Sequence, residues 1–203
     1  SYAEAEFNIA ITSMMMGELY EAFRAYERRW AIENFPSPPR NFFKKIWRGP
    51  EADPEKPLLV YMEQGMGDEV MFSWYMPFLV RDTQKVLLDC DGRLTGIMKR
   101  TYPEIDCVAR DLAGDPRALD PFWTHKTPIG HVPQYYVPEM KQYIRDNWDN
   151  FVKRGERHPP RLVVDPERLE LWRQRLKDRF GDKPVVGVSW RSSLHTPIRD
   201  GQY

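Results

Sequence analysis

A short turn, Glu63-Gln64-Gly65-Met66-Gly67-Asp68, holds the residues best suited to chemistry in this chain. A carboxylate such as Asp68 can accept a proton from a hydroxyl group, or it can cap a helix by accepting backbone N–H groups. Glycine at positions 65 and 67 lets the backbone approach a ligand closely or adopt a positive φ. The pattern alone leaves two interpretations open, a ligand site and a capped start of a helix.

Apolar stretches on both sides predict the elements that position this turn. Leu58–Met62 is a continuous apolar run, which is typical of a strand buried on both faces. Residues 69–81 carry apolar side chains near helical spacing, and Pro77 predicts a kink or break in that helix. Strand, glycine turn and helix form the first unit of a Rossmann-like parallel sheet, in which such turns face the ligand crevice.

The alternation of strands and helices continues and predicts an α/β fold. Asp165-Pro166 is a strong helix start, Gly181 ends that helix, and its apolar side chains predict a buried face. That face consists of Leu169, Trp172, Leu176 and Phe180. Residues 111–138 have no clean period and are expected to form a long loop. The remaining predictions are strands at Lys85–Cys90, Ile105–Ala109 and Pro184–Trp190, and helices at Arg93–Arg100 and Pro138–Lys153.

The N-terminal residues 1–33 predict a helical hairpin that turns at Gly17-Glu18. The order Asn8, Ala10, Gly17, Ala22, Tyr26 resembles a tetratricopeptide repeat. A single hairpin cannot bury both of its faces, so it either ends a longer array or docks onto the next domain. Residues 34–56 are rich in proline and are expected to be an extended linker. The side chains expected to pin this linker to a domain surface are Phe42, Phe43, Ile46 and Trp47.

The composition excludes several classes of protein. The 203 residues include 30 basic and 30 acidic side chains, so the chain has no electrostatic footprint for nucleic acid or an anionic membrane. No apolar run approaches the roughly 20 residues of a membrane span, and no signal-peptide pattern is present, which favours a cytoplasmic protein. Cys90 and Cys107 are expected to be reduced thiols in the core. The four scattered histidines argue against a protein-built metal site.

Several motifs occur in an order that resembles a known family. After the hairpin and the linker come Glu-Gln-Gly-Met-Gly-Asp at 63–68, Pro-Ile-Gly-x-Val-Pro at 128–133, and Val-Asp-Pro-Glu-Arg-x-x-x-Trp-Arg at 164–173. Val-Gly-Val-Ser-Trp-Arg follows at 186–191. This order resembles the bacterial tetratricopeptide-containing glycosyltransferases related to heptosyltransferases and, more distantly, to protein O-GlcNAc transferases. The resemblance covers nearly the whole chain.

The resemblance implies the GT-B fold, in which two Rossmann-like domains face each other across a cleft. Residues 57–182 would be the acceptor-side domain, and residues 183–203 would begin the donor-side domain, so the chain corresponds to an N-terminal half. The implied reaction is inverting transfer of a sugar from a nucleotide sugar to a hydroxyl of a protein or glycan. It needs no metal and no cofactor besides the nucleotide-sugar co-substrate.

The resemblance also implies roles for individual residues. Asp68 would be the general base, and Arg191 would stabilise the departing nucleoside diphosphate or merely pair with an acidic neighbour. Glu63 is either an acceptor-binding group or an anchor for loop amides. His131, where relatives often carry serine, is either a second acid/base or a hydrogen-bonded loop residue. The other implied residues are Gln64, Gly65 and Gly67 for acceptor binding, and Ser189, Ser192 and His195 for donor binding.

Two further functions remain open on the sequence. The chain could be a non-catalytic interaction module, in which the hairpin docks a protein partner and the Rossmann-like domain is degenerate. It could also be a small-molecule-binding α/β domain unrelated to sugars. Neither the sugar nor the acceptor is specified by these residues.

Overall fold

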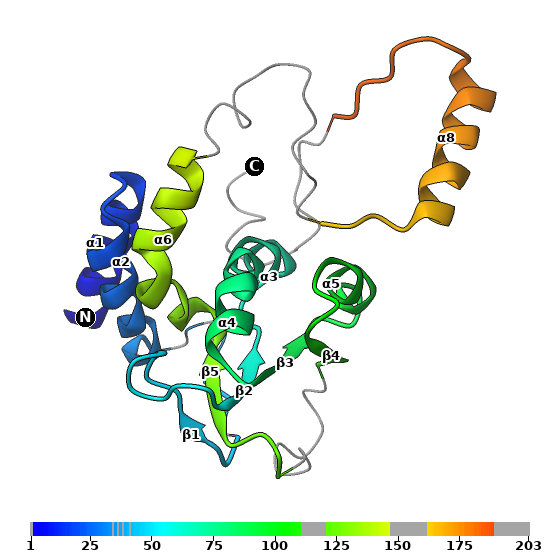
Figure 1. The fold of residues 1–203 in the computed structure, drawn as a ribbon. Helices are drawn as coiled ribbons and strands as arrows, with labels where there is room; N and C mark the ends of the chain where they lie inside the picture. The colour runs from blue at the N-terminus through cyan, green and yellow to red at the C-terminus, as the bar shows by residue number, and fades with distance from the viewer. Residues whose placement is uncertain are drawn as a thin grey trace. The chain divides into compact units, whose positions relative to one another are not determined.

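The computed structural model describes residues 2–33, 35, 37, 39–40, 42–110, 121–146 and 162–188. The chain divides into two compact units, Ser1–Val163 and Val164–Tyr203. The first unit combines a parallel sheet with helices, and the described part of the second contains one helix (Figure 1). The fold is therefore α/β, as predicted, and is compatible with a Rossmann-like arrangement.

The sheet of the first unit has five strands in the order β1-β5-β2-β3-β4, and every neighbouring pair is parallel. The predicted strands at 58–62, 85–90 and 105–109 are confirmed to within one residue at each end. The apolar runs of the first two become buried on both faces, as a parallel sheet requires, whereas in the third, over Asp106–Ala109, only Cys107 is buried. The strands are β1 (Lys45–Ile46), β2 (Pro57–Tyr61), β3 (Lys85–Cys90), β4 (Asp106–Ala109) and β5 (His125–Pro128).

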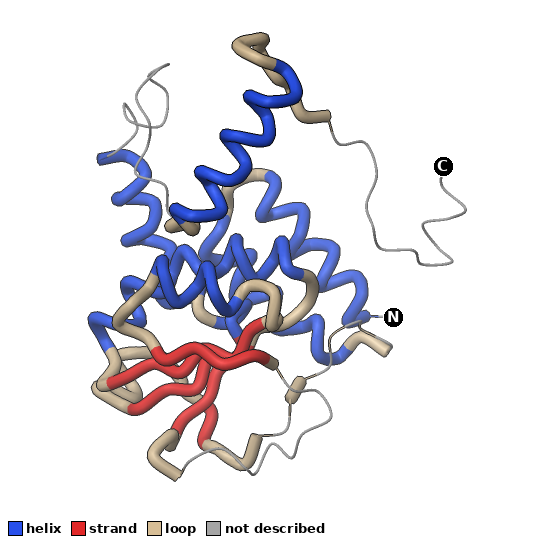
Figure 2. Tube along the Cα trace, turned by 90° about the vertical axis from the view of Figure 1, so that its right-hand side faces the viewer, coloured by secondary structure: helices blue, strands red, loops and turns tan. Residues whose placement is uncertain are grey.

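The helices of the first unit gather on one side of the sheet (Figure 2). The helix predicted at 69–81 is interrupted near Pro77, as expected, because proline lacks a backbone N–H and fits best in the first turn of a new helix. The helical elements are α1 (Tyr2–Met15), α2 (Leu19–Tyr26), η1 (Glu27–Ala31), α3 (Met66–Phe72), η2 (Ser73–Tyr75), α4 (Met76–Asp82), α5 (Thr95–Thr101), η4 (Ile129–His131) and α6 (Pro133–Asp146), with α8 (Pro166–Phe180) in the second unit.

The prediction of a loop over 111–138 holds for residues 121–124, which are turn and coil, and is wrong for residues 125–138, while 111–120 lie outside the described residues. Strand β5 lies between β1 and β2, and it is buried although it reads His-Lys-Thr-Pro. Helix α6 begins at Pro133 and contains Pro138, so it starts five residues earlier than predicted. The strand has no apolar signature in the sequence, because its burial comes from its place between two other strands and not from apolar side chains.

The linker also contributes to the sheet, through β1. Phe42 and Trp47 are buried, whereas Phe43 and Ile46 are exposed, so only two of the four expected apolar anchors are in place. The ammonium group of Lys126 in β5 donates to the carbonyl oxygen of Phe42 at 2.7 Å. The linker is therefore attached by backbone pairing and by a buried cation as well as by apolar side chains.

The two faces of the sheet bury different clusters. On one face Leu58, Val60 and Leu88 pack with the helices, and on the other Leu59 and Leu87 pack with residues of loops. Alternate residues of a strand point to opposite faces, so β2 and β3 supply both clusters. Each fully buried Leu or Val contributes roughly 1.5–3 kcal/mol. The second cluster is completed by Phe42, Tyr61 and Trp123.

The second unit confirms the predicted start and end of its helix. Asp165 caps α8 by accepting the Arg168 N–H at 3.1 Å, and Gly181 ends it with a φ of 64°. The predicted buried face is wrong, because Trp172 is 55% exposed and the described residues of this unit offer it no core. The strand predicted at 184–190 is not formed over 184–188, where no strand partner occurs among the described residues, and 189–190 lie outside them.

The N-terminal helical hairpin forms as predicted. Within the first unit it packs against the part that contains the sheet, with α2 against α6 (Figure 1). Phe23 and Tyr26 enter the main core, and Phe7 is half-buried beside them. Of the two possibilities left open by the sequence, docking is the one observed for this hairpin. Its relationship to tetratricopeptide repeats stays a prediction.

An ion pair lies at the centre of the docked hairpin. Arg29 in η1 is fully buried, and it donates to both carboxylate oxygens of Glu63 at 3.0 and 2.9 Å. The guanidinium carbon lies 4.5 Å from the ring centre of Tyr26 and 4.1 Å from that of Trp30. Arg29 also donates to the Tyr26 carbonyl oxygen and to Glu27, and these three partners with the two rings compensate for the loss of hydration of its charge.

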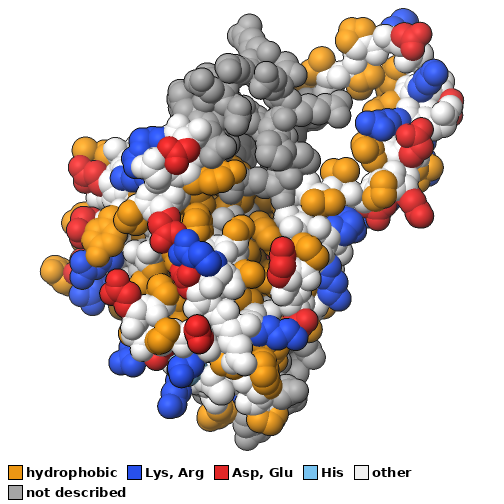
Figure 3. All heavy atoms as spheres, in the orientation of Figure 1, with side chains coloured by type: hydrophobic (Ala, Val, Ile, Leu, Met, Phe, Trp, Pro, Cys, Tyr) orange, Lys and Arg blue, Asp and Glu red, His pale blue; other side chains and the backbone are white. Residues whose placement is uncertain are grey.

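Charged side chains of both signs are interspersed on the face shown in Figure 3. Among the described residues, that face has no broad patch of one sign, in keeping with the equal numbers of basic and acidic side chains. No described helix is long and apolar enough to cross a bilayer.

We expect Arg29→Ala to lower the free energy of unfolding by about 3–5 kcal/mol, because it leaves the Glu63 carboxylate buried without its charged partner. Urea unfolding followed by circular dichroism measures this change. Arg28→Ala is the matched control, since the adjacent Arg28 side chain is 60% exposed and pairs with Glu6 on the surface. The control should cost less than about 1 kcal/mol. Equal losses in the two variants would contradict a central role for the buried pair.

Candidate functional site

The strand order identifies where a ligand crevice would lie. From β2 the chain continues outward through β3 and β4, and then returns to the other side of β2 as β5. In open parallel sheets, ligands bind at the carboxyl ends of the strands where the order reverses in this way. The two loops that meet there are 62–65 after β2 and 129–131 after β5. Their contact is direct, because the Gly130 N–H donates to Glu63 Oε1 at 3.0 Å.

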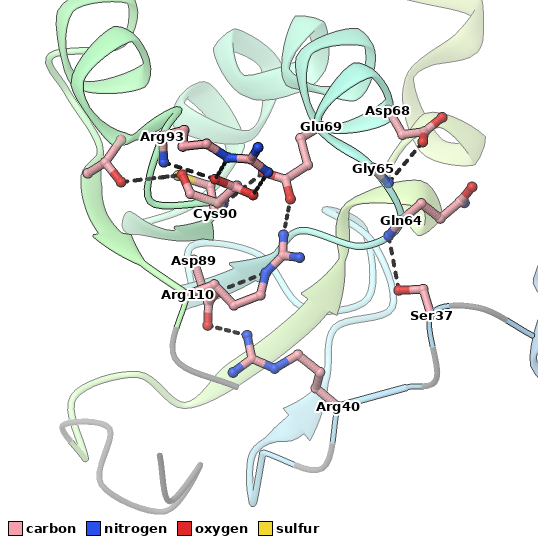
Figure 4. A network of polar contacts seen from close by, with 12 residues as sticks. Ser37, Arg40, Gln64, Gly65, Asp68, Glu69, Asp89, Cys90, Arg93 and Arg110 are labelled. Carbon is pink, nitrogen blue, oxygen red and sulfur yellow. Dashed lines mark hydrogen bonds and ion pairs between the residues drawn. The ribbon is translucent and has the colours of Figure 1, made fainter. Parts of the chain in front are cut away.

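Asp68 lies at this edge of the sheet, in the first turn of α3. Its Oδ2 atom accepts the Gly65 N–H at 3.1 Å, and the side chain is half-exposed (Figure 4). The capping contact considered from the sequence is therefore present. The carboxylate is nevertheless not sealed under the chain, and the described residues give its other oxygen no hydrogen bond. Asp68 can cap the helix with one oxygen and present the other to a ligand.

A positive φ, one of the two roles predicted for the glycines of this turn, belongs to another residue. Gly65 has a φ of −93°, and the left-handed residue of the turn is Gln64, with a φ of 62°. The Gln64 N–H donates to the Ser37 hydroxyl at 2.9 Å, and its side-chain amide donates to the Tyr26 hydroxyl. A Cβ added at Gly67 would meet nothing within 4 Å. Gly67 thus borders open space that the described residues leave unfilled.

Glu63 has the geometry of the anchor that was one of its two predicted roles. Its side chain is buried, and it accepts hydrogen bonds from Arg29 and from the Gly130 N–H. Burial raises the pKa of the Glu63 carboxyl, and the Arg29 guanidinium opposes that rise. The residue joins the hairpin, the β2 loop and the β5 loop at one point. It does not extend into open space.

His131 is held as a loop residue by partners on both ring nitrogens. Nε2 lies 2.9 Å from the Tyr135 hydroxyl, and Nδ1 lies 3.0 Å from Glu27 Oε2 and 2.7 Å from the Gln134 amide. Although burial raises the pKa of the Glu27 carboxyl, the hydrogen bond from His131 and the charge of Arg29 hold it below its usual value. The second of the two predicted roles, a hydrogen-bonded residue, matches this geometry.

A second carboxylate, Glu69, fixes the orientation of α3. Its Oε2 accepts the Asp91 N–H at 2.9 Å, and its Oε1 accepts a hydrogen bond from Arg110 (Figure 4). These contacts join α3 to the residues that follow β3 and β4. Burial raises the pKa of the Glu69 carboxyl, and both contacts oppose that rise. Nothing in the sequence marks this residue, because a single glutamate in a predicted helix gives no signal of such contacts.

The donor-binding part of the predicted site stays a prediction. Ser189, Arg191, Ser192 and His195, the proposed donor-binding residues, lie outside the described residues. Among the described ones, no cluster of three or more potential metal-ligating side chains occurs.

The fold defines an α/β protein with a five-stranded parallel sheet, compatible with a Rossmann-like fold. No family model matches the chain, and no solved structure matches it. Protein FlbA of Caulobacter vibrioides is similar to it, with 26% identity over 210 residues that cover 94% of this chain and 32% of FlbA. The chain therefore spans about a third of the length of that relative.

Two glycines of the crevice should respond differently to alanine. At Gly130 a Cβ would lie 2.5 Å from Glu63 Oε1 and 3.2 Å from a ring carbon of Tyr26, whereas at Gly67 it would be unobstructed. We expect Gly130→Ala to cost about 1–3 kcal/mol by overpacking, because Arg29 prevents the carboxylate from moving aside. Gly67→Ala should leave stability unchanged or raise it by up to about 1 kcal/mol, since alanine favours helix. Thermal and urea unfolding measure both changes. A Gly130→Ala protein as stable as the wild type would contradict the tight packing of Glu63 and Tyr26 around position 130.

Proposed function

We propose that this chain is the acceptor-side domain of a GT-B glycosyltransferase that moves a sugar from a nucleotide sugar to a hydroxyl of a protein or glycan. The observation that carries the proposal is the half-exposed carboxylate of Asp68, at the carboxyl end of β2 and beside the open space at Gly67. The strand order and the family resemblance both point to the same loop. A cytoplasmic location in a bacterium is part of the proposal.

In this reaction the acceptor hydroxyl attacks the anomeric carbon and must lose its proton as it does so. Asp68 is the general base, and a base in this role typically accelerates a reaction by about 10²–10⁴-fold. Gly65 and Gly67 let the acceptor approach the carboxylate without a Cβ in the way. Attack from the side opposite the leaving group inverts the configuration of the sugar.

The departing nucleoside diphosphate needs electrostatic stabilisation. By resemblance this role falls to Arg191, helped by Ser189, Ser192 and His195 at the start of the donor-side domain. These donors replace a metal ion in the proposed mechanism, and the nucleotide sugar is a co-substrate, so no cofactor is required.

The ion pair of Arg29 and Glu63 supports a shared role for the hairpin and the sheet unit. It connects the hairpin directly to the loop that precedes Asp68. The hairpin would therefore contribute one wall of the acceptor site, through the hydrogen bond between Tyr26 and Gln64. Gln64 and Glu63 would then act on the acceptor by shaping the loop, and His131 by supporting it from the β5 side.

A non-catalytic interaction module is the second candidate, and one observation favours it. Helix α1 and the turn after it expose apolar side chains, among them Tyr2 at 80%, Ile9 at 62% and Met16 at 69%. Exposed apolar groups can mark a protein interaction surface. In that case the hairpin would bind a protein partner, and Asp68 would serve only as a cap. The name FlbA states no reaction, so the similarity favours neither candidate.

We expect Asp68→Asn, made in a protein that carries both this chain and a donor-side domain, to lower sugar transfer by about 10²–10⁴-fold. Asparagine can still accept the Gly65 N–H, so the melting temperature should not change. Release of nucleoside diphosphate from a panel of nucleotide sugars, in the presence of acceptor extracts, measures transfer.

Asp91→Asn provides the matched control at the same edge of the sheet. Asp91 follows β3 and pairs with Arg93, and it has no proposed part in the reaction. Its variant should retain transfer. Full turnover by Asp68→Asn would rule out Asp68 as the base. An equal loss of transfer in both variants would show that replacing either carboxylate at this edge of the sheet lowers activity.

A further inference from the structure

Two cysteines that the proposed reaction does not use lie side by side in the sheet. Cys90 is the last residue of β3 and Cys107 lies in the adjacent β4, and their sulfur atoms are 3.4 Å apart. Both side chains are buried, with exposed fractions of 0% and 5%. They belong to the same core cluster, on the face of the sheet that the helices cover. The two cysteines lie 17 positions apart in the sequence, and nothing in the intervening residues indicates this contact.

The surroundings of the pair give it a route to small reagents. Cys107 lines an open groove of about 920 Å³ at the β4 edge of the sheet, together with Lys99, Ile105 and other described residues. Cys90 lies behind it, 3.9 Å from the Thr95 hydroxyl and 3.8 Å from the Val108 carbonyl oxygen. Cys107 therefore connects the groove to Cys90, whose sulfur lies 3.4 Å from its own.

The two thiols are not equivalent. The hydrogen bond from Cys107 lowers the pKa of Cys90, while the same bond and burial raise the pKa of Cys107. Of the two thiols, Cys90 therefore holds its proton less tightly than Cys107. Because the thiolate is the nucleophile in cysteine chemistry, this asymmetry is the one that a reacting pair of thiols needs.

The register determines what kind of bond the pair can form. Leu88 is opposite Cys107 and Cys90 is opposite Ala109, so the cysteines occupy diagonal positions in the ladder. A disulfide requires the sulfurs to approach to about 2.05 Å and the two Cα atoms to lie within roughly 7 Å. With its sulfurs 3.4 Å apart, this diagonal pair reaches the bonding distance only if the side chains or the strands adjust. Strained disulfides have higher reduction potentials and are the labile ones, whereas unstrained bonds are structural.

We propose that Cys90 and Cys107 are a redox modification site that a peroxide converts into a reversible disulfide between β3 and β4. The Cys90 thiolate attacks one peroxide oxygen, the O–O bond breaks, and the released hydroxide takes up a proton to become water. Cys107 then attacks the sulfenic sulfur of Cys90, and the S–O bond breaks with loss of a second water. Two thiols and one hydrogen peroxide thus give one disulfide and two waters.

The bond would affect the candidate site through one residue. The Cys90 carbonyl oxygen accepts the Arg110 N–H at 2.6 Å, and the side chain of Arg110 binds Glu69 in α3. An adjustment of β4 against β3 therefore shifts a group that holds the helix of Asp68.

The test treats the native protein with hydrogen peroxide, blocks the remaining thiols with N-ethylmaleimide after denaturation, and measures the intact mass. We expect the mass to fall by two hydrogen atoms with no maleimide added, and a digest without reductant to link the peptides of Cys90 and Cys107. Dithiothreitol should restore two reactive thiols. The variants Cys90→Ser and Cys107→Ser, with melting temperatures recorded to verify folding, should form no such link.

A control distinguishes the native reaction from oxidation of unfolded chains. The rate of disulfide formation should not change in urea concentrations too low to unfold the protein. A rate that rises in parallel with unfolding would overturn the proposal. So would native protein that keeps both thiols, or that accumulates separate sulfinic acids, at a peroxide concentration that oxidises the urea-unfolded chain. If a serine variant does not fold, the linked peptide and the urea dependence in wild type decide the question.

Discussion

The buried pair of Arg29 and Glu63 is the interaction on which the rest of the sheet unit depends. Removing two charges from water costs several kcal/mol for each ion unless geometry and hydrogen bonds compensate. Here both carboxylate oxygens bind the guanidinium, and one of them also accepts the Gly130 N–H. The hairpin, the β2 loop and the β5 loop must therefore assemble together. The same pair leaves no space for a side chain at position 130.

A second layer of contacts determines how the glycine turn presents Asp68. Gln64 is held in a left-handed conformation by Ser37 and Tyr26, while Glu69 attaches the next helix to the loops after β3 and β4. A catalytic or binding group is effective when its supporting residues are locked by packing and hydrogen bonds. The turn meets that condition on both sides, although Gly67 itself faces open space. Rigid support next to an unfilled surface is the arrangement that a ligand site requires.

The far edge of the sheet is connected to this support. Arg110 follows β4, donates its backbone N–H to the Cys90 carbonyl oxygen, and donates from its side chain to Glu69. Because interiors are closely packed and transmit strain, a change in the spacing of β3 and β4 is felt at α3. The pair of thiols and the glycine turn, which are far apart in the sequence, thus share one supporting network.

Sequence by itself determined the elements whose signals are local. The apolar runs of β2 and β3, the turn of the N-terminal hairpin, and the Asp165 cap of α8 were all predictable, because neighbouring residues contain the whole pattern. Only the tertiary structure decided that the polar β5 is a central strand, that Glu63 pairs with Arg29 from 34 residues away, and that the positive φ falls on Gln64. These features arise from contacts between distant segments, and a residue cannot show in its own neighbourhood which distant group will compensate for its burial.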